Sequence, residues 1–366
     1  MPTNLHRLTM ALALFACLLF WGDLKAQGGS TPPFTVDRAN PAQSARWVSY
    51  LIDRHGPLAT GPDRAFRESI ADTLDQLCGV QSNAVFNPLL DPVSGPFLAA
   101  LFRIRMLEGL RRLSLDPPPA TGVNVYKLYS SCFVVRDAQR TVGFDFAEGP
   151  FVLAGLNTIP LTFLSDLADQ LDVLFVSHVH ADHLSVFLMA EMVARGKPVL
   201  APQEIINVLQ GNGYLWASAV QPTVGGVTPQ SAGGLTTWVF EGRQWPGVSA
   251  GGGKLPPMPG FAPINNVYAM RMGGLNIVHF GDNNDVGVLP WLNSLAAIGM
   301  KPDLILMVGY LAPQIHAVTQ APLTLLGHEY EFGHAVGAGF AFLAMPPQPD
   351  PLRRVLFWGE SLHVAP

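Results

Sequence analysis

The chain has 366 residues, of which 49% are hydrophobic and 13% are charged, and its formal net charge is −5. This composition excludes an intrinsically disordered chain and predicts a large buried core in one large or two modest domains. The weakly acidic balance, without any basic run, excludes nucleic acid as a standing partner, whereas a small-molecule substrate stays open.

Residues 1–26 have the pattern of a secretory signal peptide. The start is weakly positive, the run Leu8–Trp21 is apolar, and Ala26 offers a small residue before a cut at Gln27. Because the apolar run is short for a membrane span, we expect cleavage, no stable membrane span afterwards, and a periplasmic or secreted protein. A lipid-modified start at Cys17 is the less favoured alternative, since apolar residues continue beyond this cysteine.

Two cysteines remain after cleavage, Cys78 and Cys132. In an oxidising compartment they could form one disulfide. Equally, Cys132 lies in an apolar segment and could be a buried thiol that packs as a small hydrophobic residue.

Residues 27–120 are predicted to form a helical N-terminal region. A Gly-, Ser- and Pro-rich lead-in is followed by apolar residues at helical spacing between Pro41 and Leu115. The triple proline Pro117-Pro118-Pro119 ends this region and marks the boundary to a second domain, residues 121–366.

Beyond this boundary the pattern changes to strands. Val123–Val135 and Thr141–Phe146 predict two strands joined by a turn over 136–140. Asp145, near the end of the second strand, is either a solvated strand end or an anchor behind a metal ligand. Gly247–Pro263 predicts a mobile loop. Five further strands are expected over 236–241, 267–272, 275–280, 304–308 and 354–358.

The centre of the chain carries the strongest chemical signal. The apolar run 171–176 predicts a buried strand, and His178-Val179-His180-Ala181-Asp182-His183 follows it directly. A helix over 161–171 leads into this strand. The strand, a helix over 186–195 and a strand over 197–202 form a βαβ unit, which places the motif at the carboxyl end of its strand. Imidazoles and carboxylates are preferred zinc ligands, so this spacing favours a metal site over a His-rich surface loop.

The spacing His178-x-His180-x-Asp182-His183 after a strand resembles the metallo-β-lactamase superfamily, and the likeness extends from residue 121 to about 361. The resemblance implies an α/β (α+β) fold, a four-layer αβ/βα sandwich with metals at the edge between two sheets, here with a helical N-terminal extension. Within it, Asp145 matches the early strand-end aspartate of the family.

The same resemblance implies a ligand set. His178 and His180 would bind a first metal, Asp182 and His183 would bind a second together with His328, and Asp282 would bridge the two. The family usually has one more His ligand between the first motif and the bridging Asp, and this chain has none there. Glu241 or Gln244 could replace it through oxygen. His334 is either another ligand or a supporting residue, and His279 is predicted to be a core or supporting histidine.

These observations predict an exported metal-dependent hydrolase. A metal-activated water would attack an ester, lactone, amide or phosphodiester bond, with Asp182 as a catalytic residue as well as a ligand. The cofactor is expected to be one or two zinc ions, with manganese or iron open. The alternative is a non-catalytic or single-metal relative that binds a ligand on the same fold.

Overall fold

The computed structural model describes residues 32–58, 60–77, 94–148, 159–180, 182–243, 264–283, 291–308, 312–327 and 353–366. The predicted signal peptide, Cys78 and the loop 247–263 lie outside these ranges. None of the helices within them is both long enough and apolar enough to cross a membrane.

Helices begin the described chain, as the apolar spacing predicts. They are α2 (Pro41–Arg54), α3 (Gly61–Leu77) and α4 (Ser94–Leu115). The apolar stripe of α2, formed by Ala45, Val48, Leu51 and Ile52, is buried. Cys132, in the region that follows, is also buried, and its pairing with Cys78 stays a prediction.

The first sheet has seven strands in the order β14-β1-β2-β3-β4-β5-β6. The strands from β14 to β3 pair antiparallel, and those from β3 to β6 pair parallel. Their bounds are β1 (Val123–Lys127), β2 (Phe133–Arg136), β3 (Thr141–Phe144), β4 (Val173–Phe175), β5 (Val199–Ala201), β6 (Gln221–Pro222) and β14 (Ser361–Val364).

Helices connect the parallel strands of this sheet, and the predicted βαβ unit is present. They are α5 (Leu161–Gln170), α6 (Val186–Ala194), α7 (Gln203–Gly211) and the 3₁₀ helix η2 (Leu215–Ala219). The helix α6 starts at Ser185, whose hydroxyl accepts the Leu188 amide N–H at 3.0 Å. This capping bond ends the motif loop and satisfies one of the first-turn amides that have no partner within the helix.

The second sheet also has seven strands, in the order β13-β12-β11-β10-β9-β8-β7. The strands are β7 (Gln230–Ala232), β8 (Leu235–Arg243), β9 (Ile264–Met272), β10 (Leu275–His279), β11 (Leu304–Val308), β12 (Leu323–Gly327) and β13 (Arg353–Val355). Two helices accompany it, α8 (Trp291–Ala297) and α9 (Ala312–Thr319).

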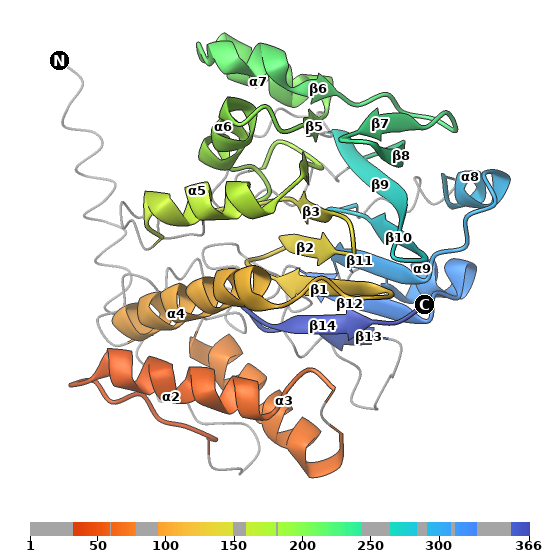
Figure 1. Cartoon of the computed structure of the whole chain (residues 1–366). Coiled ribbons are helices and arrows are strands. Elements are labelled where there is room, and N and C mark those ends of the chain that lie inside the picture. The colour runs from red at the N-terminus through yellow and green to blue at the C-terminus, as the bar shows by residue number, and fades with distance from the viewer. Residues whose placement is uncertain are drawn as a thin grey trace, which may run out of the picture.

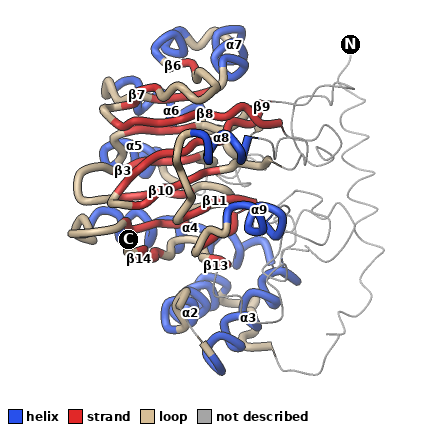
Figure 2. Tube along the Cα trace, turned by 90° about the vertical axis from the view of Figure 1, so that its right-hand side faces the viewer, coloured by secondary structure: helices blue, strands red, loops and turns tan. Residues whose placement is uncertain are grey.

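The two sheets face each other, and helices cover their outer sides (Figures 1 and 2). Successive side chains of a strand point to opposite faces of its sheet, so alternate residues pack in different layers. Val173 and Phe175 of β4 lie in the core between the sheets, whereas Leu174 packs in the cluster that includes the helices. Phe175 contacts Tyr268 of β9 across the seam, with ring centroids 4.8 Å apart. The predicted α/β class and four-layer sandwich are confirmed.

One predicted strand is wrong. Residues 123–135 form two antiparallel strands, β1 and β2, in place of one. The chain reverses at Ser130, whose φ is +53°, and the Leu128 amide donates to the Cys132 carbonyl at 3.0 Å to close the turn. The turn has only the buried pair Ser130-Ser131 as polar residues, between the buried Tyr129 and Cys132. It contains no Gly, Pro, Asn or Asp, the residues that mark most turns in a sequence.

Candidate metal centre

Three segments that follow strands meet at one edge of the two sheets. Asp145 follows β3, the stretch Ser177–His183 follows β4, and Asp282 follows β10. The strands β3 and β4 are parallel neighbours in the first sheet, and β10 belongs to the second. The amide of Asn266, on β9, donates to the Ser177 carbonyl at 2.9 Å, so the backbone itself joins the two sheets beside the motif.

His178, His183 and Asp282 form a buried cluster with metal-binding geometry. Each offers one ligand atom, and these atoms all lie within 4.8 Å of one another. The His183 Nε2 atom is 3.1 Å from Asp282 Oδ1, and His178 Nε2 is 3.9 Å from Asp282 Oδ2. Two imidazoles and a carboxylate form a donor set that suits zinc and similar divalent ions.

The two other motif side chains lie at the border of this cluster. Asp182 Oδ2 is 3.2 Å from His183 Nε2, and the Asp182 side chain is 12% exposed. The His180 ring is half-buried, with its centroid 4.7 Å from that of His178. Both are therefore near the cluster, on its more accessible side.

Asp145 holds the cluster from behind. Its carboxylate is fully buried and accepts the Ser177 amide N–H at 2.6 Å, the Ser177 hydroxyl at 2.6 Å and the His183 Nδ1 at 2.8 Å. The solvated strand end considered above is excluded, and the geometry is that of an anchor for His183.

Burial and charge act in opposite directions on the two histidines. Burial lowers the pKa of His178 well below its ordinary value, and His183 and His180 lower it further. Burial also lowers the pKa of His183, but the carboxylates of Asp282, Asp182 and Asp145 outweigh this effect and hold it well above its ordinary value. The three carboxylates therefore favour a positive charge at this place. A bound divalent cation would also compensate their negative charge.

The His178 Nε2 atom is the most direct indication that a cation fits. It is buried and makes no hydrogen bond with any described residue. A buried polar atom left in this way costs free energy unless another group satisfies it. A metal ion beside Asp282 would do so, and the residues present fit one.

The remaining predicted residues are placed as follows. Gln244, His328 and His334 lie outside the described residues. Glu241 is on β8, where its half-exposed side chain pairs with Arg243 and does not belong to the buried cluster.

His279 is buried in β10. Its ring stacks on Phe144 with centroids 4.7 Å apart, and its Nε2 lies 3.6 Å from Asp145 Oδ2. This position is that of a core histidine behind the site, as the sequence predicts.

Two supporting residues have no clear signal in the sequence. Ser177 contacts both Asp145 and His178. Asn265, with its amide oriented so that the oxygen faces the loop, accepts the amide N–H groups of Asp282 and Asn283 at 2.9 and 2.6 Å. Ser177 could be suspected from its place directly before His178, whereas the role of Asn265 depends on how β9 meets the loop after β10.

Comparisons with known proteins give structural likeness only. No protein-family model matches the sequence, and no curated protein matches it. A possible metal-dependent hydrolase from Veillonella parvula aligns at a TM-score of 0.49 with 12% identity, covering 67% of this chain and 100% of that chain. Isothiocyanate hydrolase from Delia radicum gut bacteria aligns at a TM-score of 0.48 with 12% identity, covering 66% and 99%.

A third solved structure is Igni18, a metallo hydrolase from the archaeon Ignicoccus hospitalis, with a TM-score of 0.43, 17% identity and coverage of 66% and 98%. These TM-scores lie below 0.5, so the fold rests on the strand order and layers of the chain itself. The two facing sheets, their outer helices and the motif at the sheet edge have the arrangement that the metallo-β-lactamase resemblance implies.

Proposed function

We propose that this chain is a metal-dependent hydrolase whose ion is held by His178, His183 and Asp282, with His180, Asp182 and His328 as further ligands. The observation that carries the proposal is the buried His178 Nε2, which faces Asp282 without a hydrogen-bond partner among the described residues. Zinc is the first candidate, and manganese and iron suit the same donors.

A bound ion of this kind lowers the pKa of a coordinated water and polarises the bond to be broken. The residues of the chain supply the rest. Asp145 fixes the His183 ring through its Nδ1, so that Nε2 faces Asp282. The Asp182 side chain is more exposed than those of His183 and Asp282, and in this proposal its carboxylate takes the proton that the attacking water loses. An ester, lactone, amide or phosphodiester of a small molecule is the proposed substrate, and nucleic acid is not a proposed partner.

The test combines metal analysis with a substrate screen. Purified parent protein is expected to retain about one ion per chain or more, whereas His183→Ala and Asp282→Ala lose it. The variant Asp303→Asn is the matched control, because its carboxylate caps the Asn276 amide at 2.8 Å at the start of β10, far along the strand from Asp282. Equal metal content in all four proteins would contradict the assignment.

A single-metal or non-catalytic relative is the second candidate. The observation that favours it is Glu241, which pairs with Arg243 at the surface and so supplies no oxygen to the cluster. Next to it, a Cβ atom at Gly242 would lie 1.9 Å from Asn283 Nδ2, so no ligand side chain fits there either. A metal content of one, with no chelator-sensitive turnover of ester, lactone, amide or phosphodiester substrates, would favour this candidate.

The proposal includes export. Residues 1–26 carry the signal-peptide pattern described above. Protein recovered from the periplasm or the medium is expected to begin at Gln27, as read by N-terminal sequencing. A mature protein that retains residues 1–26 would contradict this part of the proposal.

A further inference from the structure

We propose that Ser177 is a positioning residue that fixes the tautomer of His178, so that Nε2 carries the lone pair offered to the metal. This inference rests on the proposed metal site and adds a residue to it. It also joins the two histidines of the cluster to one carboxylate, that of Asp145.

The single proton of the Ser177 hydroxyl decides which atom donates in each of its hydrogen bonds. The Ser177 hydroxyl has a single hydrogen, and it donates this hydrogen to Asp145 Oδ2 at 2.6 Å. Ser177 Oγ also lies 2.9 Å from His178 Nδ1. Because the hydroxyl proton is already used, the oxygen must accept here, and Nδ1 must donate. His178 is therefore protonated on Nδ1, and its Nε2 is bare.

The same carboxylate acts directly on the other histidine. Asp145 Oδ2 accepts from His183 Nδ1 at 2.8 Å, which directs His183 Nε2 towards Asp282. Asp145 thus orients the His183 ring through a direct hydrogen bond. It orients the His178 ring indirectly, because Ser177 hydrogen-bonds to both Asp145 and His178. Partners of this kind fix ring orientation and ligand basicity.

The surroundings hold Ser177 in a single position. Its amide donates to Asp145 Oδ1 at 2.6 Å, and its carbonyl accepts from the Asn266 amide at 2.9 Å. Gly281 packs against it so closely that an added Cβ would lie 2.6 Å from Ser177 Oγ. Ser177 is fully buried, so it does not contact a substrate, and its role is to position His178.

The experiment reads the tautomer directly. In metal-free protein labelled with ¹⁵N-histidine, the His178 ring is expected to show a protonated Nδ1 and a bare Nε2, with the signals assigned by their loss in His178→Ala. In Ser177→Ala this preference is lost, and the dissociation constant for zinc, measured by chelator competition, rises about 10- to 100-fold. Ser177→Thr keeps the hydroxyl and is expected to restore the tautomer and most of the affinity.

Ser49→Ala is the matched control for loss of a buried hydroxyl, because Ser49 Oγ accepts from Arg105 far from the site. It is expected to change neither the tautomer nor the zinc affinity. A parent His178 protonated on Nε2, or a Ser177→Ala protein with unchanged tautomer and affinity, would overturn the inference. If Ser177→Ala does not fold, the tautomer of His178 in the parent still tests the inference, since protonation on Nε2 would overturn it. A parent that binds no metal but shows the Nδ1 tautomer would reject the proposed function and the offer of Nε2 to a metal, and would leave only the role of Ser177 in fixing the tautomer.

Discussion

Asp145 is the residue on which most of the site depends. Its φ is +42°, a left-handed conformation that aspartate tolerates better than most residues but that still costs energy. In this conformation its carboxylate accepts three short hydrogen bonds from Ser177 and His183. Charge-assisted bonds of this kind offset the local cost, and they tie the end of β3 to the motif after β4.

Asp145→Asn is expected to weaken metal binding about 10- to 100-fold. An amide offers only one oxygen, so it cannot accept from the Ser177 amide on one side and from the Ser177 hydroxyl and His183 on the other. Chelator competition measures the change. Asp172→Asn is the control, because Asp172 Oδ2 caps the Thr141 amide at 2.7 Å at the opposite end of β4, and unchanged affinity is expected there.

Gly281→Ala is expected to destabilise the fold by more than about 1 kcal/mol and to reduce metal retention. The φ of Gly281 is +53°, and a Cβ would lie 2.4 Å from the side-chain amide group of Asn265 and 2.6 Å from Ser177 Oγ. Urea unfolding measures the loss.

Gly196→Ala separates the two causes, since Gly196 has a φ of +65° with nothing within 4 Å of the added Cβ. Gly196→Ala should therefore lose only the stability that a side chain costs at a positive φ, without the cost of a steric clash. Equal losses in the two variants would mean that the close approach at Gly281 adds nothing.

At the residue scale the sequence could indicate the ligand types but not their supports. His178, Asp182 and His183 are neighbours in the chain, so their proximity follows from local spacing, and Gly281-Asp282 follows a clear strand. The contacts of Ser177 and Asn265 arise from the register of strands in different sheets, for which a single sequence carries no signal.

Among the elements, α4 has the largest unpredicted role, because it holds the segment before β14. Arg105 is fully buried in α4 and donates through Nε to the Trp358 carbonyl at 2.6 Å. Gly359 has a φ of +72°, and a Cβ there would lie 2.1 Å from the Arg105 carbonyl oxygen. Arg67 of α3 also contacts this segment. Its guanidinium donates two hydrogen bonds to the Glu360 carboxylate, at 2.7 and 2.6 Å.

Glu360→Gln is expected to destabilise the protein by about 3–5 kcal/mol, because it removes the charge of the carboxylate that pairs with the buried Arg67 guanidinium. Urea unfolding measures the loss. The double variant Arg67→Met, Glu360→Leu removes both charges and is expected to recover part of it.

Asp169→Asn, which breaks an exposed pair with Arg195, should have little effect and serves as the control. If it lost as much stability as Glu360→Gln, burial would not be the cause of the larger effect.

Glu108 of α4 gives a prediction about pH. Hydrogen bonds from Arg111, and then from Arg112, lower its pKa from 4.5 to about 2. Because the folded pKa lies below the unfolded one, the stabilisation is present above about pH 4.5 and is lost as the pH falls towards 2. Glu108→Gln should therefore cost about 1 kcal/mol or less at pH 7, and this difference from the parent should shrink in urea unfolding near pH 3.

At the element scale, long and strongly periodic segments could be predicted, and so could the short strands β4 and β5, which lie in the predicted segments 171–176 and 197–202. The stripes of α2, α5 and α6 and the apolar run of β11 correspond to observed elements. The hairpin between β1 and β2 was not predictable, because its turn is buried and contains no Gly, Pro, Asn or Asp. The strands β6 and β7, of two and three residues, lie in no apolar run and are too short to show a period, so they were not predicted.

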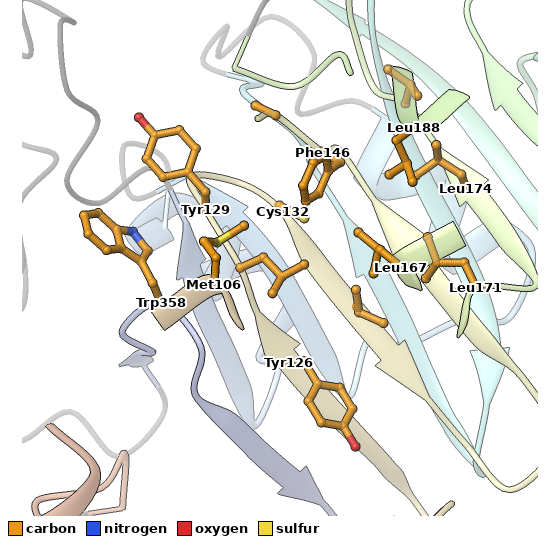
Figure 3. Packing of buried hydrophobic residues seen from close by; sticks show 14 of the residues in the cluster. Met106, Tyr126, Tyr129, Cys132, Phe146, Leu167, Leu171, Leu174, Leu188 and Trp358 are labelled. Atoms are coloured by element: carbon orange, nitrogen blue, oxygen red, sulfur yellow. The ribbon is translucent and has the colours of Figure 1, made fainter. Parts of the chain in front are cut away.

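At the scale of the whole molecule, the N-terminal helices share a core with the first sheet. Phe102 of α4 lies edge-on to Tyr129 at 5.2 Å and to Trp358 at 5.5 Å. Figure 3 shows Met106 in the same packed group, beside Tyr129 and Cys132. The division into domains 27–120 and 121–366 stays a prediction from the sequence. The contacts of Phe102 and Met106 join residues on both sides of that boundary.

A chain that starts at residue 121 is therefore expected not to fold alone. Its loss of α4 removes a set of fully buried apolar side chains: Phe97, Leu98, Leu101, Phe102 and Met106. Each contributes about 1.5–3 kcal/mol, and together they match the about 5–15 kcal/mol by which a typical domain is stable. Near-UV circular dichroism is expected to show no fixed aromatic packing in this chain. A chain that starts at residue 32 keeps α2, α3 and α4 and should retain the parent signal. A cooperative unfolding transition in the 121–366 chain at the parent temperature would show that the sheets do not need these three helices.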